Sequence, residues 1–148
     1  MGWNLPDEAL KLDNQLCFAL YVCSKEIIRK YKPLLEPLNL TYTSYITMLA
    51  LWEKDDVTVK ELGKRLTLDS GTLTPLLKKL ESLSYIDRIR SSNDERNVYV
   101  RLTNQGRALK KAAAGIPEQM ICSTNIQREK AIQLWGTLHE LMNSLSND

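Results

Sequence analysis

The chain's three cysteines, Cys17, Cys23 and Cys122, are its residues with the greatest capacity for covalent chemistry. A cysteine reacts as its thiolate, which attacks peroxides and disulfides and binds metal ions. Metal binding is not favoured, because the cysteines and the single histidine, His139, show no ligand spacing. An odd number of cysteines without a pattern of pairs is typical of a reducing compartment, so we expect a cytoplasmic protein.

Cys17 has a tyrosine on the same predicted helical face. Tyr21 follows four residues later in an apolar segment, and side chains at this spacing are neighbours on a helix. A phenolic hydroxyl that donates to sulfur favours the thiolate, and a thiolate attacked by peroxide becomes a reversible sulfenic acid. The alternative is that Cys17 is inert packing. Cys23 lies about 240° further round the helix and is expected to be structural.

Residues 57–102 predict a helix, a short turn, a second helix and a β-hairpin. The segment VTVKELGKRL opens with a capping box between Thr58 and Glu61. In LDSGTLTPLLKKLESL, five leucines recur at helical spacing and form one buried stripe. The segments YIDRIR and RNVYVRL alternate around the polar tip SSNDE. This order predicts a winged helix-turn-helix, which places one helix in a major groove of DNA and the hairpin beside it.

Pro75 conflicts with a regular second helix. If Asp69 caps this helix, Pro75 denies the carbonyl of Gly71 its hydrogen-bond partner, because proline has no N–H. Either the helix begins nearer Thr72, or its first turn is irregular.

The charge distribution supports a nucleic-acid interface. Residues 58–111 contain 12 Lys and Arg against 6 Asp and Glu, whereas the remainder contains 8 against 12. A basic segment within an otherwise acidic chain is expected where one face meets phosphate. The alternative is a solvated surface with chance clustering.

The remaining segments predict a mostly α fold with a small β-wing. Helices are expected in 12–53 and 104–146, with Pro117 interrupting the second region. Their apolar surface exceeds what one winged helix can cover, which favours a homodimer over a monomer with a large core. We expect one domain over 1–148, with 12–53 and 104–146 for dimerisation and 57–102 for DNA binding. No apolar run approaches the roughly 20 residues of a membrane span, and no Gly-rich phosphate loop indicates a cofactor.

Over nearly its full length the chain resembles the MarR family of transcription regulators. DSGTLTPLLKKLE (69–81), NDERN (93–97) and LTNQG (102–106) carry this resemblance. QLCFALY (15–21), YKPLL (31–35) and LTYTSY (40–45) resemble the family's organic-hydroperoxide-sensing branch. The resemblance implies a dimeric winged-helix repressor that occupies a palindromic operator in double-stranded DNA.

The resemblance also implies roles for individual residues. Across the dimer interface, Tyr31 and Tyr42 are expected to reach Cys17, which an oxidant such as an organic hydroperoxide would oxidise. Cys122 is a candidate resolving thiol; otherwise a low-molecular-weight thiol would cap oxidised Cys17. Arg96 is expected in the minor groove, held by Asp94. The other residues expected to contact DNA are Ser70, Thr72, Thr74, Lys78, Lys79, Arg88 and Arg90.

Three classes of function therefore compete. The first is a repressor that releases its operator when Cys17 is oxidised. The second is a repressor relieved by a small phenolic or anionic ligand between the dimer helices and the winged region. The third is a thiol peroxidase that uses Cys17, which the absence of a CxxC pair and the DNA-reading segment disfavour.

Overall fold

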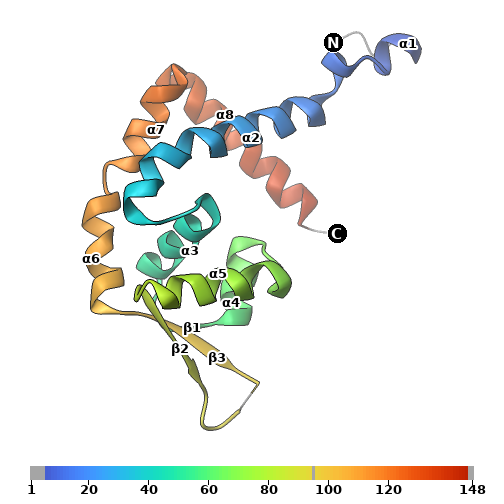
Figure 1. Cartoon of the computed structure of the whole chain (residues 1–148). Helices are drawn as coiled ribbons and strands as arrows, with labels where there is room; N and C mark the ends of the chain where they lie inside the picture. Colours follow the sequence, from blue (N-terminus) through green and yellow to red (C-terminus); the bar gives the residue numbers. More distant parts are fainter. Residues whose placement is uncertain (1–5, 95, 147–148) are drawn as a thin grey trace. The chain divides into compact units, whose positions relative to one another are not determined.

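The computed structural model describes residues 6–94 and 96–146, which form helices and one small sheet (Figure 1). The helices are α1 (Pro6–Ala9), α2 (Leu16–Leu35), α3 (Tyr42–Glu53), α4 (Val59–Leu66), α5 (Ser70–Ser82), α6 (Asn104–Ala113), α7 (Ile116–Thr124) and α8 (Arg128–Leu145). Short 3-10 turns cover Leu12–Asn14 and Glu36–Leu38, and the strands are β1 (Val57–Thr58), β2 (Ile86–Arg90) and β3 (Val98–Leu102). The predicted mostly helical fold with a small β-wing is confirmed.

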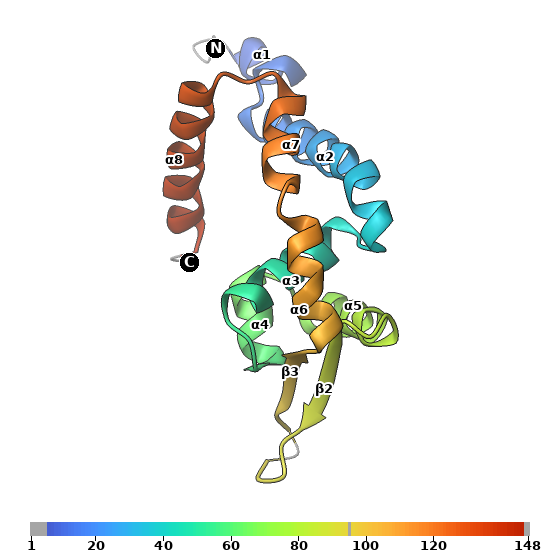
Figure 2. The ribbon, with the colours of Figure 1, turned by 90° about the vertical axis from the view of Figure 1, so that its left-hand side faces the viewer.

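The chain divides into two compact units, Met1–Ala114 and Gly115–Asp148. In the first unit, β2 and β3 extend beyond α4 and α5 as a wing (Figure 2). The second unit contains α7 and α8, and Pro117 lies in the first turn of α7. The predicted interruption of the C-terminal helical region at Pro117 is therefore confirmed. Among the described residues, no helix combines the length and hydropathy of a membrane span.

The predicted capping box begins α4. The hydroxyl of Thr58 accepts the backbone N–H of Glu61 at 3.1 Å, and the Glu61 carboxylate accepts the N–H of Thr58 at 2.8 Å. The hydrogen bond from the Thr58 backbone holds the pKa of Glu61 below its usual value. Thr67 ends α4 in the left-handed conformation, with φ of 55°, which turns the chain toward α5.

Helix α5 begins at Ser70, with Asp69 as its N-cap and Pro75 inside it. The alternative start nearer Thr72 is wrong. The Asp69 carboxylate accepts the N–H of Thr72 at 2.7 Å and so fixes the first turn upstream of Pro75. The proline still removes the N–H that would pair with the Gly71 carbonyl.

The three strands form an antiparallel sheet in the order β1-β3-β2. Val57 pairs with Val100, and Ile86 pairs with Leu102, so these four apolar side chains are buried together at the base of the wing. Both hairpin strands were predicted, but β1 was not. A strand of two residues has no alternating pattern, and its threonine also serves as the cap of α4.

Leucines of α4 and α5 pack with α3 and the sheet in the core of the first unit. The fully buried side chains here include Met48, Leu51, Leu62, Leu73, Leu77, Leu80, Ile86 and Val100. Trp52 donates its indole N–H to the carbonyl of Gly106 at 2.9 Å and so joins α3 to α6. Only glycine fits at position 106, because a Cβ atom there would lie 2.0 Å from the carbonyl oxygen of Tyr85.

Candidate functional site

One face of α5 presents the polar residues predicted to contact DNA. They are Ser70, Thr72, Thr74, Lys78 and Lys79, all exposed apart from the half-buried Thr74. The N-cap hydrogen bond from the backbone of Thr72 holds the pKa of Asp69 below its usual value. Hydroxyls at a helix start and cations further along suit phosphate and base contacts. The contact of these five residues with DNA remains a prediction.

An ion pair fastens α5 to the first strand of the wing. Glu81 accepts the Arg88 guanidinium at 3.0 Å and the Arg88 backbone N–H at 3.2 Å. The hydrogen bond from the Arg88 side chain holds the pKa of Glu81 below its usual value. The Arg88 guanidinium, predicted to contact DNA, thus already has a carboxylate partner. Arg90, two residues further along the strand, is exposed.

The hairpin tip places Asp94 and Arg96 together. The Asp94 carboxylate accepts the backbone N–H of Arg96 at 3.0 Å and its guanidinium Nε at 3.3 Å, while the Arg96 side chain is 92% exposed. A turn-bound carboxylate therefore orients a guanidinium that projects into solvent. This is the geometry expected of an arginine that enters a narrow minor groove, although the DNA contact itself remains a prediction.

Cys17 lies in the first turn of α2, and its side chain is exposed. The cap residue Gln15 makes no side-chain hydrogen bond to this helix start. Tyr21, one turn further along, is 62% exposed, and the ammonium of Lys25 lies 5.5 Å from the centre of its ring. Cys17 and Tyr21 therefore lie one turn apart on α2, and both side chains are exposed.

The other predicted tyrosines form a cluster where α2 meets α3. The ring centres of Tyr31 and Tyr42 lie 5.0 Å apart, and those of Tyr31 and Tyr45 lie 5.6 Å apart. Burial, with smaller effects from Tyr42 and Tyr45, raises the pKa of Tyr31 to about 12. Burial likewise raises the pKa of Tyr45. At neutral pH the phenol of Tyr31 therefore stays protonated, so its hydroxyl is able to donate a hydrogen bond.

Sequence reasoning missed Tyr45, which is only 2% exposed. Its spacing of three residues from Tyr42 places both on one face of α3, but aromatic residues at helical spacing are usually core residues. The signal was therefore present in LTYTSY without being specific.

Within one chain, the thiol and the phenol cluster lie at opposite ends of α2. At 1.5 Å per residue, Cys17 and Tyr31 are about 21 Å apart along the helix. The structure thus brings Tyr31 to Tyr42 but does not bring either residue to Cys17. The contact of Tyr31 and Tyr42 with Cys17, expected across a dimer interface, therefore remains a prediction.

Cys122 lies in a groove of the second unit. The groove has a volume of about 720 Å³, and Ile121, Ile132 and Trp135 line it beside the exposed thiol. Cys23, expected to be structural, is also exposed. Within residues 6–94 and 96–146, no cluster of three or more His, Cys, Asp or Glu side chains is suited to a metal ion.

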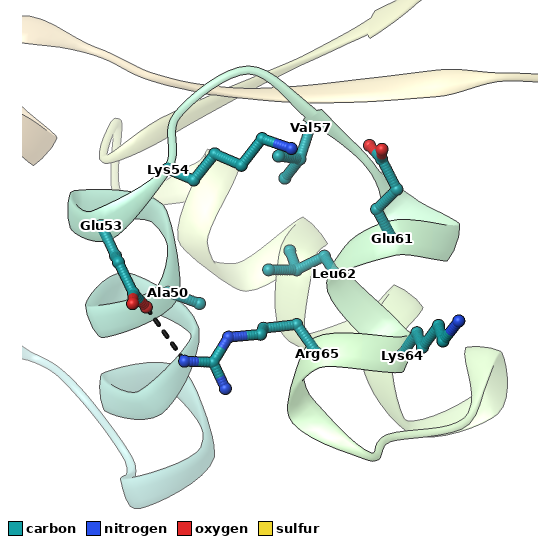
Figure 3. Close-up of a pocket in the computed structure, with 8 residues that line it drawn as sticks. All are labelled: Ala50, Glu53, Lys54, Val57, Glu61, Leu62, Lys64 and Arg65. Carbon is teal, nitrogen blue, oxygen red and sulfur yellow. Dashed lines mark hydrogen bonds and ion pairs between the residues drawn. The ribbon is translucent and has the colours of Figure 1, made fainter.

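A second cavity, of about 830 Å³, lies between the end of α3 and α4 (Figure 3). Its apolar lining comes from Ala50, Val57 and Leu62. Arg65 and Glu53 form an ion pair of 3.1 Å across it. Lys54, Lys64 and Glu61 also line this cavity, so it joins an apolar surface to charged groups of both signs.

Known proteins resemble this chain over most of its length. Residues 29–113 match the family model described as transcriptional regulator SarA/Rot. The organic hydroperoxide resistance transcriptional regulator of Bacillus subtilis is 46% identical over 136 residues, which cover 92% of each chain.

Solved structures of a protein named AbfR share the fold. Its reduced form bound to DNA has a TM-score of 0.78 and 30% identity, covering 95% of this chain and 99% of that one. Its disulfide form has a TM-score of 0.65 and 34% identity, covering 94% and 98%. Because of these relatives and the winged helix-turn-helix of residues 57–102, the chain belongs to the MarR family of transcriptional regulators, in the branch that contains the organic hydroperoxide resistance regulator.

Proposed function

We propose that this protein is a homodimeric, DNA-binding transcriptional repressor that releases its operator when an organic hydroperoxide oxidises Cys17. One observation carries the proposal. An exposed thiol lies in the first turn of the same helix whose other end contributes Tyr31 to a cluster of phenols. The protein is proposed to act in the cytoplasm, where a reduced thiol persists between oxidative events.

The DNA-binding part of the proposal rests on residues 57–102. The capped α5 would enter a major groove, while Arg96 at the wing tip would enter the neighbouring minor groove. In a two-fold dimer, the two winged helix-turn-helix regions contact the two halves of a palindromic operator. Double-stranded DNA is therefore the proposed partner. Segments 12–53 and 104–146 are proposed to form the dimer, so that 1–148 acts as one regulator.

The chemical step needs only the thiolate and the oxidant. The Cys17 sulfur attacks one peroxide oxygen, the O–O bond breaks, and the departing alkoxide takes a proton to become an alcohol. Sulfur is oxidised to a sulfenic acid, while the hydroperoxide is reduced. A second thiol then attacks the sulfenic acid, forms a disulfide and releases water. Cys122 or a low-molecular-weight thiol is the proposed second thiol.

Release of DNA follows from the position of the thiol. Oxidation replaces a thiolate that accepts phenol hydrogen bonds by a bulkier group, which disturbs α2 and the phenol-bearing start of α3. Because α3 packs against α4 and α5 in the core, the α5 helix of each subunit, which enters the major groove, moves with it. If oxidation makes the free energy of operator binding about 3 kcal/mol less favourable than in the reduced protein, operator binding weakens roughly 100-fold.

A second candidate is a repressor relieved by a small phenolic or anionic ligand. The cavity between α3 and α4 favours it, because an apolar lining lies beside three cationic side chains and only two carboxylates, Glu53 and Glu61. Thiol peroxidase activity is the least supported reading, since the relatives above are named as transcriptional regulators.

The test compares wild type with Cys17→Ser, Cys23→Ser and Cys122→Ser in operator binding before and after addition of cumene hydroperoxide. We expect all four to bind when reduced and only Cys17→Ser to stay bound after oxidation. Release by Cys17→Ser as complete as that of wild type would contradict thiol sensing at this residue and favour a ligand. Repeated turnover of hydroperoxide with a thiol reductant would favour an enzyme.

A further inference from the structure

We infer that Glu81 is a positioning residue for DNA binding, because its pairing with Arg88 holds the wing at a fixed angle to α5. This pair is here called the wing brace. The inference rests on the proposed function, since it specifies how Arg96 at the wing tip is directed at a minor groove while α5 lies in the major groove. It gives Arg88 a positioning role in place of the predicted contact with DNA.

The wing brace covers the open edge of the small sheet. Strand β2 is an edge strand, because the strand order is β1-β3-β2. In its pairing with β3, Ser91 donates its backbone N–H to the carbonyl of Asn97 at 2.9 Å. Hydrogen-bonded pairs alternate along an antiparallel ladder, so the N–H of Arg88, three residues earlier, points away from β3. The Glu81 carboxylate accepts this outward N–H at 3.2 Å and thereby holds the backbone of the wing.

The same carboxylate also holds the Arg88 side chain. Its Oε1 atom lies 3.0 Å from Nη2 and 3.3 Å from Nε of the guanidinium. Arg88 shares the face of β2 that carries the buried Ile86, and its side chain is only 26% exposed. Arg90, on the same face but nearer the tip, is exposed. A guanidinium neutralised by a carboxylate adds little to the attraction of phosphate, whereas the exposed Arg90 remains available for it.

Other contacts hold the base of the wing. Thr103 donates its backbone N–H to the Tyr85 carbonyl at 3.1 Å and its hydroxyl to the Ser84 carbonyl at 2.6 Å. These hydrogen bonds fix the turn between α5 and β2. The wing brace attaches β2 at Arg88, three residues beyond Tyr85, so it opposes rotation of the hairpin about that turn.

A small rotation at the brace becomes a large displacement at the wing tip, which extends beyond α5 (Figure 2). Asn93 lies five residues beyond Arg88. At about 3.3 Å per strand residue, this separation is about 17 Å, and a rotation of about 10° moves the tip by about 3 Å. That displacement is about half the width of a minor groove, which is about 6 Å. Arg96, which Asp94 orients at the tip, would then lose its alignment with the groove.

The wing brace predicts the opposite of a simple charge effect. Glu81 is an anion in the DNA-binding region, so its removal should strengthen operator binding if repulsion of phosphate were its only effect. The brace predicts weaker binding, because Arg96 loses its alignment. The role of Arg88 is separable in the same way, since a phosphate contact contributes about 0.9 to the slope of log K against log salt concentration and a brace contributes nothing.

The experiment measures operator binding of reduced, full-length protein by fluorescence anisotropy over a range of salt concentrations. Glu81→Met, Arg88→Met and the double variant are compared with Asp87→Asn and Arg90→Met, the matched controls on the same strand. We expect each single brace variant to weaken binding roughly tenfold, and the double variant to be no weaker than either, with the salt slope of wild type. Asp87→Asn should not weaken binding, and Arg90→Met should lower the salt slope by about 1.

Three results would overturn the wing brace. The first is tighter operator binding by Glu81→Met, and the second is additive losses in the double variant. The third is a salt slope lowered by about 1 in Arg88→Met, which would assign this arginine to a phosphate. Where Glu81→Met fails to fold, Glu81→Gln replaces it, because its amide oxygen still accepts the Arg88 N–H. This variant should bind roughly threefold more weakly than wild type, and unchanged binding would overturn the brace.

A second measurement tests whether the brace acts through the wing tip. Glu81→Met is combined with Arg96→Ala. Once Arg96 is absent, the Glu81 substitution should weaken binding less than about twofold, because no side chain remains for the brace to align. A general loss of stability would instead weaken binding equally in both backgrounds, and this result would overturn the positioning role.

Failure of the inference is distinguishable from failure of the proposed function. All proteins are reduced, so an absence of Cys17-dependent release would overturn the proposed sensing and leave the brace standing. A wild type that binds no operator would overturn the proposed function, and hydrogen exchange of the Arg88 amide would then test the brace alone. This amide should exchange faster in Glu81→Met than in wild type; equal rates would overturn the brace.

Discussion

Replacement of Asp55 by alanine should destabilise the first unit, because the backbone amide of Leu102 loses its hydrogen-bond acceptor. The Asp55 carboxylate accepts the backbone N–H of Leu102 at 2.8 Å, the N–H of Asp56 at 2.8 Å and the Arg107 guanidinium at 3.0 Å. It thereby ties the turn before β1 to the end of β3 and to α6. The Asp55 side chain is 31% exposed, so in the alanine variant water can hydrate its former hydrogen-bond partners only in part.

The magnitude follows from these contacts. A part-buried amide that loses its acceptor costs about 1–3 kcal/mol, and an exposed ion pair adds less than about 1 kcal/mol. We therefore expect the free energy of unfolding of Asp55→Ala to fall by about 2 kcal/mol. For a chain of 148 residues this corresponds to a decrease in Tm of roughly 4–8 °C.

Thermal and urea unfolding, followed by circular dichroism at one fixed protein concentration, measure this change. Fixed concentration matters because the stability of a dimer depends on it. Asp55→Asn is the matched control, since its side-chain oxygen still accepts the Leu102 amide; it should lose less than about 1 kcal/mol. Equal losses for both variants, or an unchanged Tm for Asp55→Ala, would refute the reasoning.

Three further predictions address other contacts. Arg96→Ala should weaken operator binding by about 1–3 kcal/mol while gel filtration and thiol oxidation stay normal, and unchanged affinity would remove the wing tip from the interface. Folding raises the pKa of Tyr31 from its ordinary value of 10.0 to about 12. The contribution of the protonated phenol to the free energy of unfolding is therefore complete below about pH 10 and is lost as pH rises through about 12. Because the pKa of Tyr45 is also raised, absorbance at 295 nm should show a late tyrosine titration whose amplitude is smaller in Tyr31→Phe; an identical titration curve for both proteins would count against it. Gly106→Ala should cost about 1–3 kcal/mol in urea unfolding, whereas Gly136→Ala, where nothing lies within 4 Å, should not destabilise; equal effects would contradict the close approach at Tyr85.

Local sequence patterns predicted the helices and hairpin of the winged helix-turn-helix correctly, because each pattern spans only a few residues. The capping box of Thr58 and Glu61 and the leucine stripe of α5 depend on helical spacing alone. The two hairpin strands follow from their alternation, although the tip residue Glu95 lies outside the described residues. The two-residue strand β1 has no such pattern and appeared only through its pairing with β3.

Contacts between distant positions were not predictable in the same way. Asp55 pairs with residues 47 and 52 positions further along, and no local spacing indicates such a partner. The pairing of Arg88 with Glu81 depends on how α5 meets β2. For the thiol site, spacing predicted the shared face of Cys17 and Tyr21. The packing of Tyr45 against Tyr31 depends on how α2 meets α3.

The most direct measurement follows DNA release and Cys17 oxidation in one sample. Fluorescence anisotropy of a labelled operator reports release after one equivalent of cumene hydroperoxide, while quenched aliquots are analysed by mass spectrometry for sulfenic acid or disulfide at Cys17. We predict that the two signals follow the same rate constant and that release is complete when about one Cys17 per chain is oxidised. Release that precedes Cys17 oxidation, or complete oxidation with the operator still bound, would contradict the account.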